Sequence, residues 1–250
     1  MDILEENHTT QNNRNLTQIL FDFNLNLSQN PRGTDKGDYK SYVNGFYEKE
    51  FEKRKGLKNR LLEVGVRSGA SVALWANYFS SIEIIGVDIV DVGTPNGPQK
   101  EYLDYPFVEY FVSDAYDEKF ANSISGEFSI LIDDGPHSLS SQKRFLELYL
   151  PKLSKDGVLV IEDVIRSYRD CFALARTLPN GNKYSFEVYN FDELKKDGGC
   201  LFVVRHNNSN KIYFWRKFKL LIHCVLDLTK VLIRRISRGD FSVVDRRIDK

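Results

Sequence analysis

The chain has 250 residues and no net charge, and its apolar (42%) and charged (28%) fractions are ordinary for a soluble globular protein. Its three cysteines, Cys171, Cys200 and Cys224, are widely spaced and form no CxxC pair, which argues against a disulfide framework and against a zinc site. The first thirty residues are polar and lack the apolar core of a secretory signal, so we expect a cytoplasmic protein.

The distribution of sequence features suggests three parts: an N-terminal arm at 1–55, a ligand-binding α/β domain at 56–206 and a basic extension at 207–250. Residues 205–250 contain twelve Lys or Arg and four Asp or Glu, so the rest of the chain is net acidic. Nucleic-acid binding is not expected, because the basic residues are confined to the extension.

The N-terminal arm carries a short apolar patch, LTQILFDF at 16–23, which suggests a helix or a loosely packed arm. Further along, aromatic residues recur at a helical spacing from Tyr39. This spacing predicts a helix on which Tyr39, Tyr42, Phe46 and Tyr47 share one face.

Apolar strands alternate with helices through the central part of the chain. Five strands are expected at 60–66, 82–89, 107–114, 128–134 and 157–163, with helices at 72–79 and 140–153 and a late hairpin at 184–190 and 200–205. Buried apolar strands that alternate with helices are typical of a parallel sheet. The expected fold is therefore a Rossmann-like, doubly wound α/β domain with a mainly parallel seven-stranded sheet.

The extension contains an amphipathic helical stripe at 215–238. Charged residues such as Lys219, Asp227 and Lys230 interrupt it too often for a membrane-spanning helix. We favour a helix that packs on the domain or across a homodimer interface. The alternative is a peripheral contact of 211–238 with the inner membrane face or with another protein.

A glycine-containing turn follows the first strand, in LLEVGVRSGAS at 61–71. Gly65 and Gly69 allow the backbone to approach a ligand closely and to turn into a helix N-terminus. Asp88 ends the next strand, where a carboxylate is placed to accept hydrogen bonds from both hydroxyls of a ribose. The plain alternative is a generic turn with a solvated aspartate.

The spacing of these glycines is GxxxG, unlike the GxGxxG that cradles a pyrophosphate. It suits a nucleoside ligand without a diphosphate, such as S-adenosylmethionine, and disfavours a nicotinamide-dependent oxidoreductase. Glu63 would act through the loop or on the ammonium group of the ligand. Asp114, at the tip of the third strand, lies near the expected adenine, although a local turn explains it equally well.

Four carboxylates end the fourth and fifth strands: Asp133, Asp134, Glu162 and Asp163. These strands are usually neighbours in this topology, so their carboxylates would repel one another without a cation. A set of oxygen ligands suits Mg²⁺, Mn²⁺ or Ca²⁺ better than Zn²⁺. The sequence therefore predicts a divalent metal site, with caps or surface acids as the alternative.

His137 lies three residues after Asp134, at the mouth of the same site. A neutral imidazole in this position can take a proton from a substrate hydroxyl. A structural role is the usual one for a lone histidine, but the neighbouring carboxylates favour a catalytic role here.

These residues resemble the metal-dependent sugar O-methyltransferases of macrolide biosynthesis, of the mycinamicin and macrocin type, and their relatives in bacterial polysaccharide clusters. The resemblance covers about residues 32–205, and its motifs are specific only in combination. They are GTDKG at 33–37, EVGVRSGAS at 63–71, IIGVDI at 84–89, DDGPH at 133–137 and VIED at 160–163.

The resemblance implies a class I S-adenosylmethionine-dependent methyltransferase with bound Mg²⁺. It assigns the metal to Asp134, Glu162 and Asp163, and catalysis to His137 as the base together with Asp134. Asp35 falls in the segment that closes over the cofactor. The implied cofactor positions are Thr34, Lys36, Tyr39, Glu63, Gly65, Ser71, Asp88, Asp114 and Asp133.

Two departures from the family pattern point to a different acceptor. Relatives often have a histidine shortly after the TDKG segment, which GDYKSY at 37–42 lacks, and Pro136 replaces a common serine. We expect methylation of a sugar hydroxyl, on a capsular or other surface polysaccharide or on a glycosylated natural product, with a free sugar, nucleotide-sugar or glycan as acceptor. The alternatives are a phosphoryl or phosphoramidate acceptor and a non-catalytic scaffold recruited through the C-terminal helix.

Overall fold

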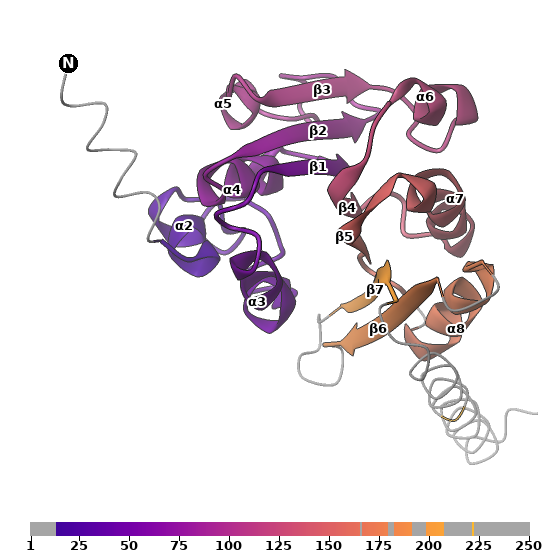
Figure 1. The fold of residues 1–250 in the computed structure, drawn as a ribbon. Coiled ribbons are helices and arrows are strands. Elements are labelled where there is room, and N and C mark those ends of the chain that lie inside the picture. The colour runs from indigo at the N-terminus through magenta and orange to yellow at the C-terminus, as the bar shows by residue number, and fades with distance from the viewer. Residues whose placement is uncertain (1–13, 166, 180–182, 192–198, 208–221, 223–250) are drawn as a thin grey trace, which may run out of the picture.

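The computed structural model describes residues 14–165, 167–179, 183–191, 199–207 and 222. These residues form one mixed sheet with helices on both faces (Figure 1). The predicted amphipathic helix at 215–238 lies outside them, apart from Ile222. Within the described part of the chain, no helix combines the length and the apolar character needed to cross a membrane.

The sheet has seven strands in the order β3-β2-β1-β4-β5-β7-β6. All neighbours are parallel except β7, which runs antiparallel to both β5 and β6. The predicted mainly parallel, seven-stranded sheet is therefore confirmed. The strands are β1 (Asn59–Val64), β2 (Ile82–Asp88), β3 (Val108–Val112), β4 (Phe128–Asp133), β5 (Leu153–Ile161), β6 (Tyr184–Asn190) and β7 (Cys200–His206).

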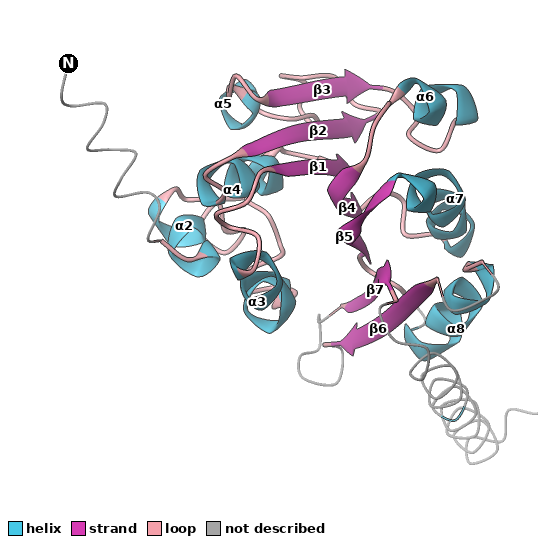
Figure 2. Ribbon diagram, in the orientation of Figure 1, coloured by secondary structure: helices cyan, strands magenta, loops and turns pink. Residues whose placement is uncertain are grey.

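The helices lie on the two faces of this sheet (Figure 2). One face is covered by α2 (Leu16–Asp22), the π-helical turn η1 (Val43–Tyr47), α3 (Glu48–Glu52) and α4 (Ala70–Tyr78). The other face is covered by α6 (Glu118–Ser123), α7 (Leu139–Tyr149) and α8 (Ser167–Thr177). Two short elements, α5 (Lys100–Leu103) and the 3₁₀ turn η2 (Leu150–Lys152), precede β3 and β5.

The order of the strands reverses at the centre of the sheet, between β1 and β4. From β1 the chain continues outward through β2 and β3, and then returns to place β4 on the other side of β1. The central strands are apolar and buried on both faces, as expected for parallel strands under two helical layers. A crevice forms at the carboxyl ends of strands where the order reverses, which is where α/β proteins bind ligands.

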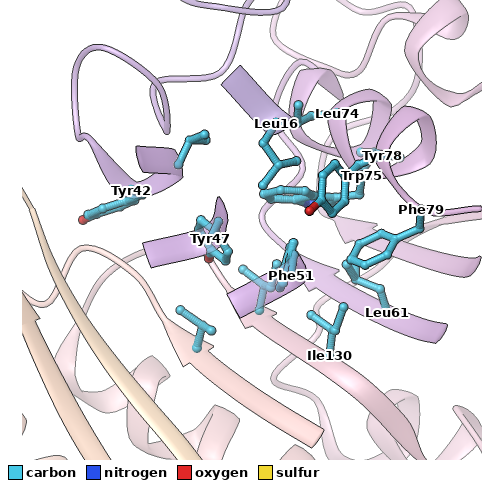
Figure 3. Packing of buried hydrophobic residues seen from close by; sticks show 14 of the residues in the cluster. Leu16, Tyr42, Tyr47, Phe51, Leu61, Leu74, Trp75, Tyr78, Phe79 and Ile130 are labelled. Carbon is cyan, nitrogen blue, oxygen red and sulfur yellow. The ribbon is translucent and has the colours of Figure 1, made fainter. Parts of the chain in front are cut away.

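The N-terminal arm packs its aromatic residues against α4 and the sheet (Figure 3). The rings of Tyr47 and Phe51 each lie about 5 Å from the indole of Trp75. Tyr42 is buried, but Tyr39 is 48% exposed, so the prediction that Tyr39 shares the aromatic face is wrong. Ser41 explains the difference, because its positive φ of 61° breaks the helical path between the two tyrosines.

Candidate active site

A cavity of about 820 Å³ opens at the carboxyl ends of the central strands. Its wall runs from Asp88 at the end of β2, past Asp114 after β3, to Asp134 after β4 and Asp163 after β5, and it includes Gly65 after β1. The size is that of a small-molecule site, for which roughly 300–1,000 Å³ is usual. The cavity therefore joins the two groups of residues that the sequence singled out.

The turn between β1 and α4 depends on its glycines. Gly65 has a φ of 85°, and a Cβ atom there would lie 2.1 Å from the carbonyl oxygen of Asp134. Gly69 has a φ of 89° and begins α4 without a side-chain cap. Because only glycine combines a positive φ with so close an approach, the turn brings β1 directly against the end of β4.

Asp88 organises the loop that faces this turn. Its Oδ2 accepts a hydrogen bond from the backbone N–H of Arg67 at 2.8 Å, and its Oδ1 accepts one from Val90 at 3.2 Å. A carboxylate can accept about four hydrogen bonds, so both oxygens retain capacity toward the cavity that Asp88 lines. This arrangement fits the recognition of a pair of hydroxyls.

Asp114 both forms a local turn and lines the cavity, the two alternatives that the sequence left open. Its Oδ1 accepts a hydrogen bond from the backbone N–H of Tyr116 at 2.9 Å, which makes a local turn, and the residue is exposed. It also lines the cavity, on the side away from the acidic cluster. The turn fixes the carboxylate at this end without removing it from the cavity.

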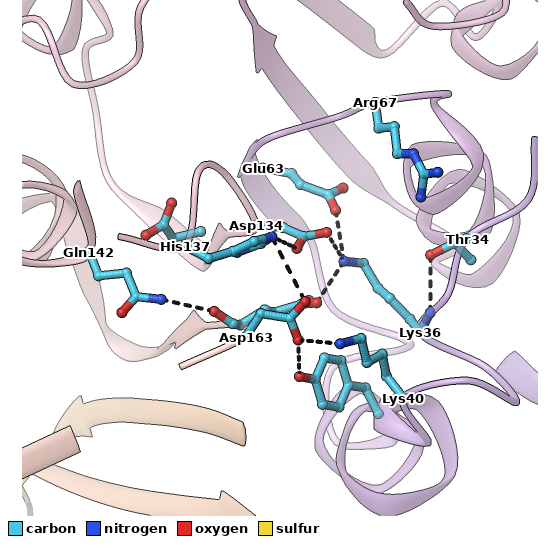
Figure 4. Close-up of polar contacts among 12 residues, drawn as sticks. Thr34, Lys36, Lys40, Glu63, Arg67, Asp134, His137, Gln142 and Asp163 are labelled. Atoms are coloured by element: carbon cyan, nitrogen blue, oxygen red, sulfur yellow. Dashed lines mark hydrogen bonds and ion pairs between the residues drawn. The ribbon is translucent and has the colours of Figure 1, made fainter. Parts of the chain in front are cut away.

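At the other end, the ammonium group of Lys36 lies among three carboxylates (Figure 4). Its Nζ is 2.6 Å from Asp134 Oδ2, 2.8 Å from Glu162 Oε2 and 3.6 Å from Glu63 Oε1. Lys36 is fully buried, as are Glu63 and, within about 1%, Glu162. A side chain from the N-terminal arm thus supplies the positive charge at these strand ends.

Burial and mutual charge shift the ionisation of this group. Burial alone would lower the pKa of Lys36, but the charges of Asp134, Glu162 and Glu63 raise it well above its usual value. Burial raises the pKa of Glu162 to about 7, against the opposing effect of Lys36. It also raises the pKa of Glu63, which Lys36, Ser71 and Trp75 partly offset. The lysine therefore keeps its charge, and it favours the ionised carboxylates.

Both oxygens of Glu162 are engaged. Oε2 accepts from Lys36, and Oε1 accepts a short hydrogen bond from the hydroxyl of Tyr47. The backbone carbonyl of Glu162 accepts from the buried Gln142 of α7 at 3.1 Å. Glu162 is thus anchored from the N-terminal arm on one side and from α7 on the other.

His137 and Asp163 face each other across the mouth of the cavity. His137 Nε2 lies 3.8 Å from Asp163 Oδ2 and 4.0 Å from Asp134 Oδ1. Both His137 (φ 57°) and Asp163 (φ 49°) have the left-handed backbone that is uncommon outside glycine and concentrates at functional sites. The other oxygen of Asp163 accepts from the hydroxyl of Tyr42 and pairs with Lys40 at 3.2 Å.

The protonation states of these two residues suit proton transfer. Burial lowers the pKa of His137, so the imidazole is neutral at pH 7. Burial would raise the pKa of Asp163, but the hydrogen bond from Tyr42 and the charges of Lys40 and His137 hold it below its usual value. Asp134, His137 and Asp163 each offer a ligand atom within 4.8 Å of the others, which also makes them a candidate metal site.

A second, smaller cavity of about 210 Å³ adjoins the first. His137 and Asp163 line both, so the two spaces adjoin at these residues. The remaining lining residues are Lys40, Val164, Ile165, Gly199 and Cys200. The main cavity therefore has a smaller space beside it, with His137 where the two meet.

The family model described as a methyltransferase domain matches residues 62–164. This part of the chain is a methyltransferase domain. It contains the glycine turn, Asp88 and the acidic ends of β4 and β5, so the matched range spans both ends of the cavity.

The curated relatives of the methyltransferase domain are of the kind that the motifs indicated. The mycinamicin VI 2''-O-methyltransferase of Micromonospora griseorubida is 27% identical over 145 residues, which are 54% of this chain and 34% of that protein. The L-olivosyl-oleandolide 3-O-methyltransferase of Streptomyces antibioticus is 27% identical over 144 residues, 54% of this chain and 36% of that protein. The resemblance to sugar O-methyltransferases is confirmed, and each match spans about a third of the relative.

Solved structures confirm the fold. The MycE methyltransferase of the mycinamycin pathway, in complex with Mg, SAH and mycinamycin VI, superposes with a TM-score of 0.56 at 19% identity. The match covers 78% of this chain and 55% of that one. The methyltransferase domain thus has the class I methyltransferase fold.

The structure places the residues predicted from the sequence in different settings. Gly65, Asp88, Asp114, Asp134, His137 and Asp163 line the main cavity of the methyltransferase domain. Lys36, Glu63 and Glu162 lie buried behind it as one charge cluster. Thr34 is buried and accepts from the backbone N–H of Lys36, Ser71 is buried beside Glu63, and Tyr39 is exposed.

Asp133 lies apart from the other strand-end carboxylates. Successive residues of a strand point to opposite faces of the sheet, so the side chain of Asp133 points away from that of Asp134. Asp133 is buried and accepts a hydrogen bond from the hydroxyl of Tyr116. Burial raises the pKa of Asp133 to about 7.

Four contributors were missed by the sequence reasoning: Arg67, Lys40, Tyr42 and Tyr47. The backbone of Arg67 binds Asp88, and the other three bind the acidic strand ends. The run of aromatic residues in the arm is the one signal of these residues in the sequence, and its spacing indicates a packing face only.

Proposed function

We propose that the protein is an S-adenosylmethionine-dependent O-methyltransferase that methylates a sugar hydroxyl, on a surface polysaccharide or on a glycosylated natural product. One observation carries the proposal: a single cavity connects the strand-end carboxylate of Asp88 to a histidine that lies beside two carboxylates. The named activities of the relatives, which are methyl transfers to glycosylated compounds, support the same chemistry.

The main cavity fits the adenosyl donor. Gly65 and Gly69 bring backbone close to the space, Asp88 offers oxygens for the ribose hydroxyls, and Asp114 marks the adenine end. The donor supplies an activated methyl group and a good thioether leaving group. What the protein adds is alignment, which can be worth about 7–11 kcal/mol of the barrier.

We assign the second cavity to the acceptor, since it adjoins the main cavity at His137 and Asp163. His137 takes the proton of the acceptor hydroxyl as that oxygen attacks the methyl group and the carbon–sulfur bond breaks. Nε2 lies beyond hydrogen-bond distance of both carboxylates, so its lone pair is available. Once protonated, the imidazolium is stabilised by Asp134 and Asp163, whose oxygens both lie near Nε2.

The acidic strand ends fit a divalent cation. Asp134 Oδ1 and Asp163 Oδ2 both face the same side of His137, and hard carboxylate oxygens suit Mg²⁺ or Mn²⁺. Glu162, the third ligand that the family resemblance implies, contacts Lys36 and Tyr47 in this structure. A bound ion would lower the pKa of an acceptor hydroxyl by stabilising its alkoxide.

A phosphoryl or phosphoramidate acceptor is the second candidate, and Lys40 is the observation in its favour. Lys40 lines the acceptor cavity and is paired there with Asp163 alone among the described carboxylates. A cation in this place would attract a negatively charged acceptor group more strongly than a neutral sugar.

The test is methyl transfer from isotopically labelled S-adenosylmethionine in the presence of Mg²⁺. Sugars, nucleotide-sugars and phosphorylated sugars are offered in parallel, and products are identified by mass spectrometry. We expect a labelled methyl ether on a sugar oxygen, and loss of activity after dialysis against a chelator that Mg²⁺ restores. A methylated phosphoryl group would favour the second candidate. Absence of S-adenosylmethionine binding by calorimetry would refute both.

A further inference from the structure

Lys36 has no role in the chemistry proposed above, although its ammonium group occupies the centre of the acidic cluster. It comes from the turn before the aromatic segment, 98 residues from Asp134 and 126 residues from Glu162 in the sequence. A fully buried lysine is costly unless it is paired, so its position calls for an explanation.

The ammonium group binds two of the three carboxylates that the family resemblance assigns to the metal. Nζ lies 2.6 Å from Asp134 Oδ2 and 2.8 Å from Glu162 Oε2; the pair with Glu162 is fully buried, and the pair with Asp134 is partly buried at the edge of the cavity. A divalent ion bound to the same two carboxylates would lie within a few ångströms of the ammonium charge. Two cations this close repel each other strongly in a site of low dielectric constant.

We propose that Lys36 is the resident counter-cation of the metal site: it holds Asp134 and Glu162 in place before the ion binds, and it leaves them when the ion binds. This inference rests on the proposed function, because it concerns the metal of that reaction. It makes Lys36 a positioning residue that sets the metal affinity.

The structure contains a second acceptor for the displaced ammonium group. Glu63 Oε1 lies 3.6 Å from Nζ and is buried, and no other described group donates a hydrogen bond to it. Its other oxygen is held by the indole N–H of Trp75 at 3.0 Å, which fixes the carboxylate in place. A small shift of Lys36 toward Glu63 would therefore keep the charge paired and release the two proposed ligands.

The test compares the Mg²⁺ affinities of three variants with that of the wild-type protein by calorimetry. Lys36→Met removes the ammonium group that competes with Mg²⁺ for Asp134 and Glu162. The two carboxylates are then always available to the ion, so Mg²⁺ should bind at least about tenfold more tightly. Glu63→Gln removes the alternative partner and should weaken Mg²⁺ binding by a similar factor. Lys58→Met is the control: the exposed Lys58 pairs with Glu83, which is not part of the acidic cluster, and its effect should stay below about threefold.

The outcomes separate this inference from the proposed function. Equal affinity gains for Lys36→Met and Lys58→Met would show a general charge effect and overturn the inference, as would an unchanged affinity in Lys36→Met. If Lys36→Met does not fold, Glu63→Gln decides: unchanged or tighter Mg²⁺ binding refutes the displacement. Binding of S-adenosylmethionine is measured alongside, and its absence in the wild-type protein would refute the proposed function instead.

Discussion

The two ends of the main cavity are built in different ways. At the nucleoside end, backbone geometry makes the site: Gly65 and Gly69 shape the turn, and Asp88 is held by backbone N–H groups from its own neighbourhood. At the acidic end, side chains from the N-terminal arm make it, since Lys36 and the arm's tyrosines bind carboxylates more than 90 residues away.

Substitutions at the two ends of the cavity should therefore have different effects. The nucleoside end depends on local conformation, so changes there should affect binding of the donor and little else. The acidic end depends on compensated charge across two segments, so changes there should affect proton transfer, metal affinity and stability together. Four predictions follow this division, from the largest expected effect to the smallest.

Replacing His137 should have the largest effect. His137→Ala removes the base, and methyl transfer should fall by about 100-fold or more, while the affinity for S-adenosylmethionine stays unchanged. Steady-state kinetics and calorimetry on the same preparation provide the measurement.

Metal affinity is the control for this variant, because His137 is also a candidate ligand. If Mg²⁺ binds as tightly as in the wild-type protein, the loss belongs to proton transfer. A parallel loss of Mg²⁺ affinity would mean that His137 holds the ion, and the assignment as base would be wrong.

Replacing Asp88 should weaken the nucleoside end alone. Asp88→Asn loses charge-assisted hydrogen bonds to the ribose hydroxyls, and the donor affinity should fall by about 10- to 100-fold. Asp114→Asn is the matched comparison, because Asp114 is exposed and should matter less. Loss of Mg²⁺ affinity in Asp88→Asn would show that the two ends are not separable.

The pH dependence of catalysis should report His137. Burial lowers the pKa of His137 below the ordinary histidine value of about 6.5. The imidazole therefore stays neutral, and able to accept a proton, until the pH falls below that value. We expect kcat/KM to be flat from pH 7 to 8 and to fall about tenfold per pH unit on the acid side of an apparent pKa below 6.5. An acid limb centred above 6.5 would contradict the proposed setting of the histidine.

Asp133 should affect stability and not binding. Its pKa is raised to about 7 in the folded protein, so its contribution to stability is complete below about pH 4 and is lost as the pH rises through 7. Asp133→Asn should therefore unfold at a temperature that depends less on pH between 4 and 7 than that of the wild-type protein. An unchanged pH dependence in thermal melts would exclude a buried, titrating Asp133.

The same division explains what the sequence predicted. The order and type of the strands, and the positions of Gly65, Asp88 and Asp134 at their tips, follow from local patterns that a single sequence displays. The contact between Lys36 and Asp134 does not follow from local patterns, because Lys36 reaches Asp134 only when the arm packs onto the sheet. The break at Ser41 likewise depends on its backbone conformation, which the aromatic spacing alone does not reveal.

The central claim is that one cavity joins a nucleoside site at Asp88 to a cation site at Asp134 and Asp163. A crystal structure with S-adenosylhomocysteine and Mn²⁺ tests it most directly, since the anomalous signal of manganese locates the ion. We predict the ribose on Asp88, and the manganese on Asp134, Glu162 and Asp163 with Lys36 turned toward Glu63. A nucleoside bound away from the glycine turn, or manganese bound away from those carboxylates, would contradict the account.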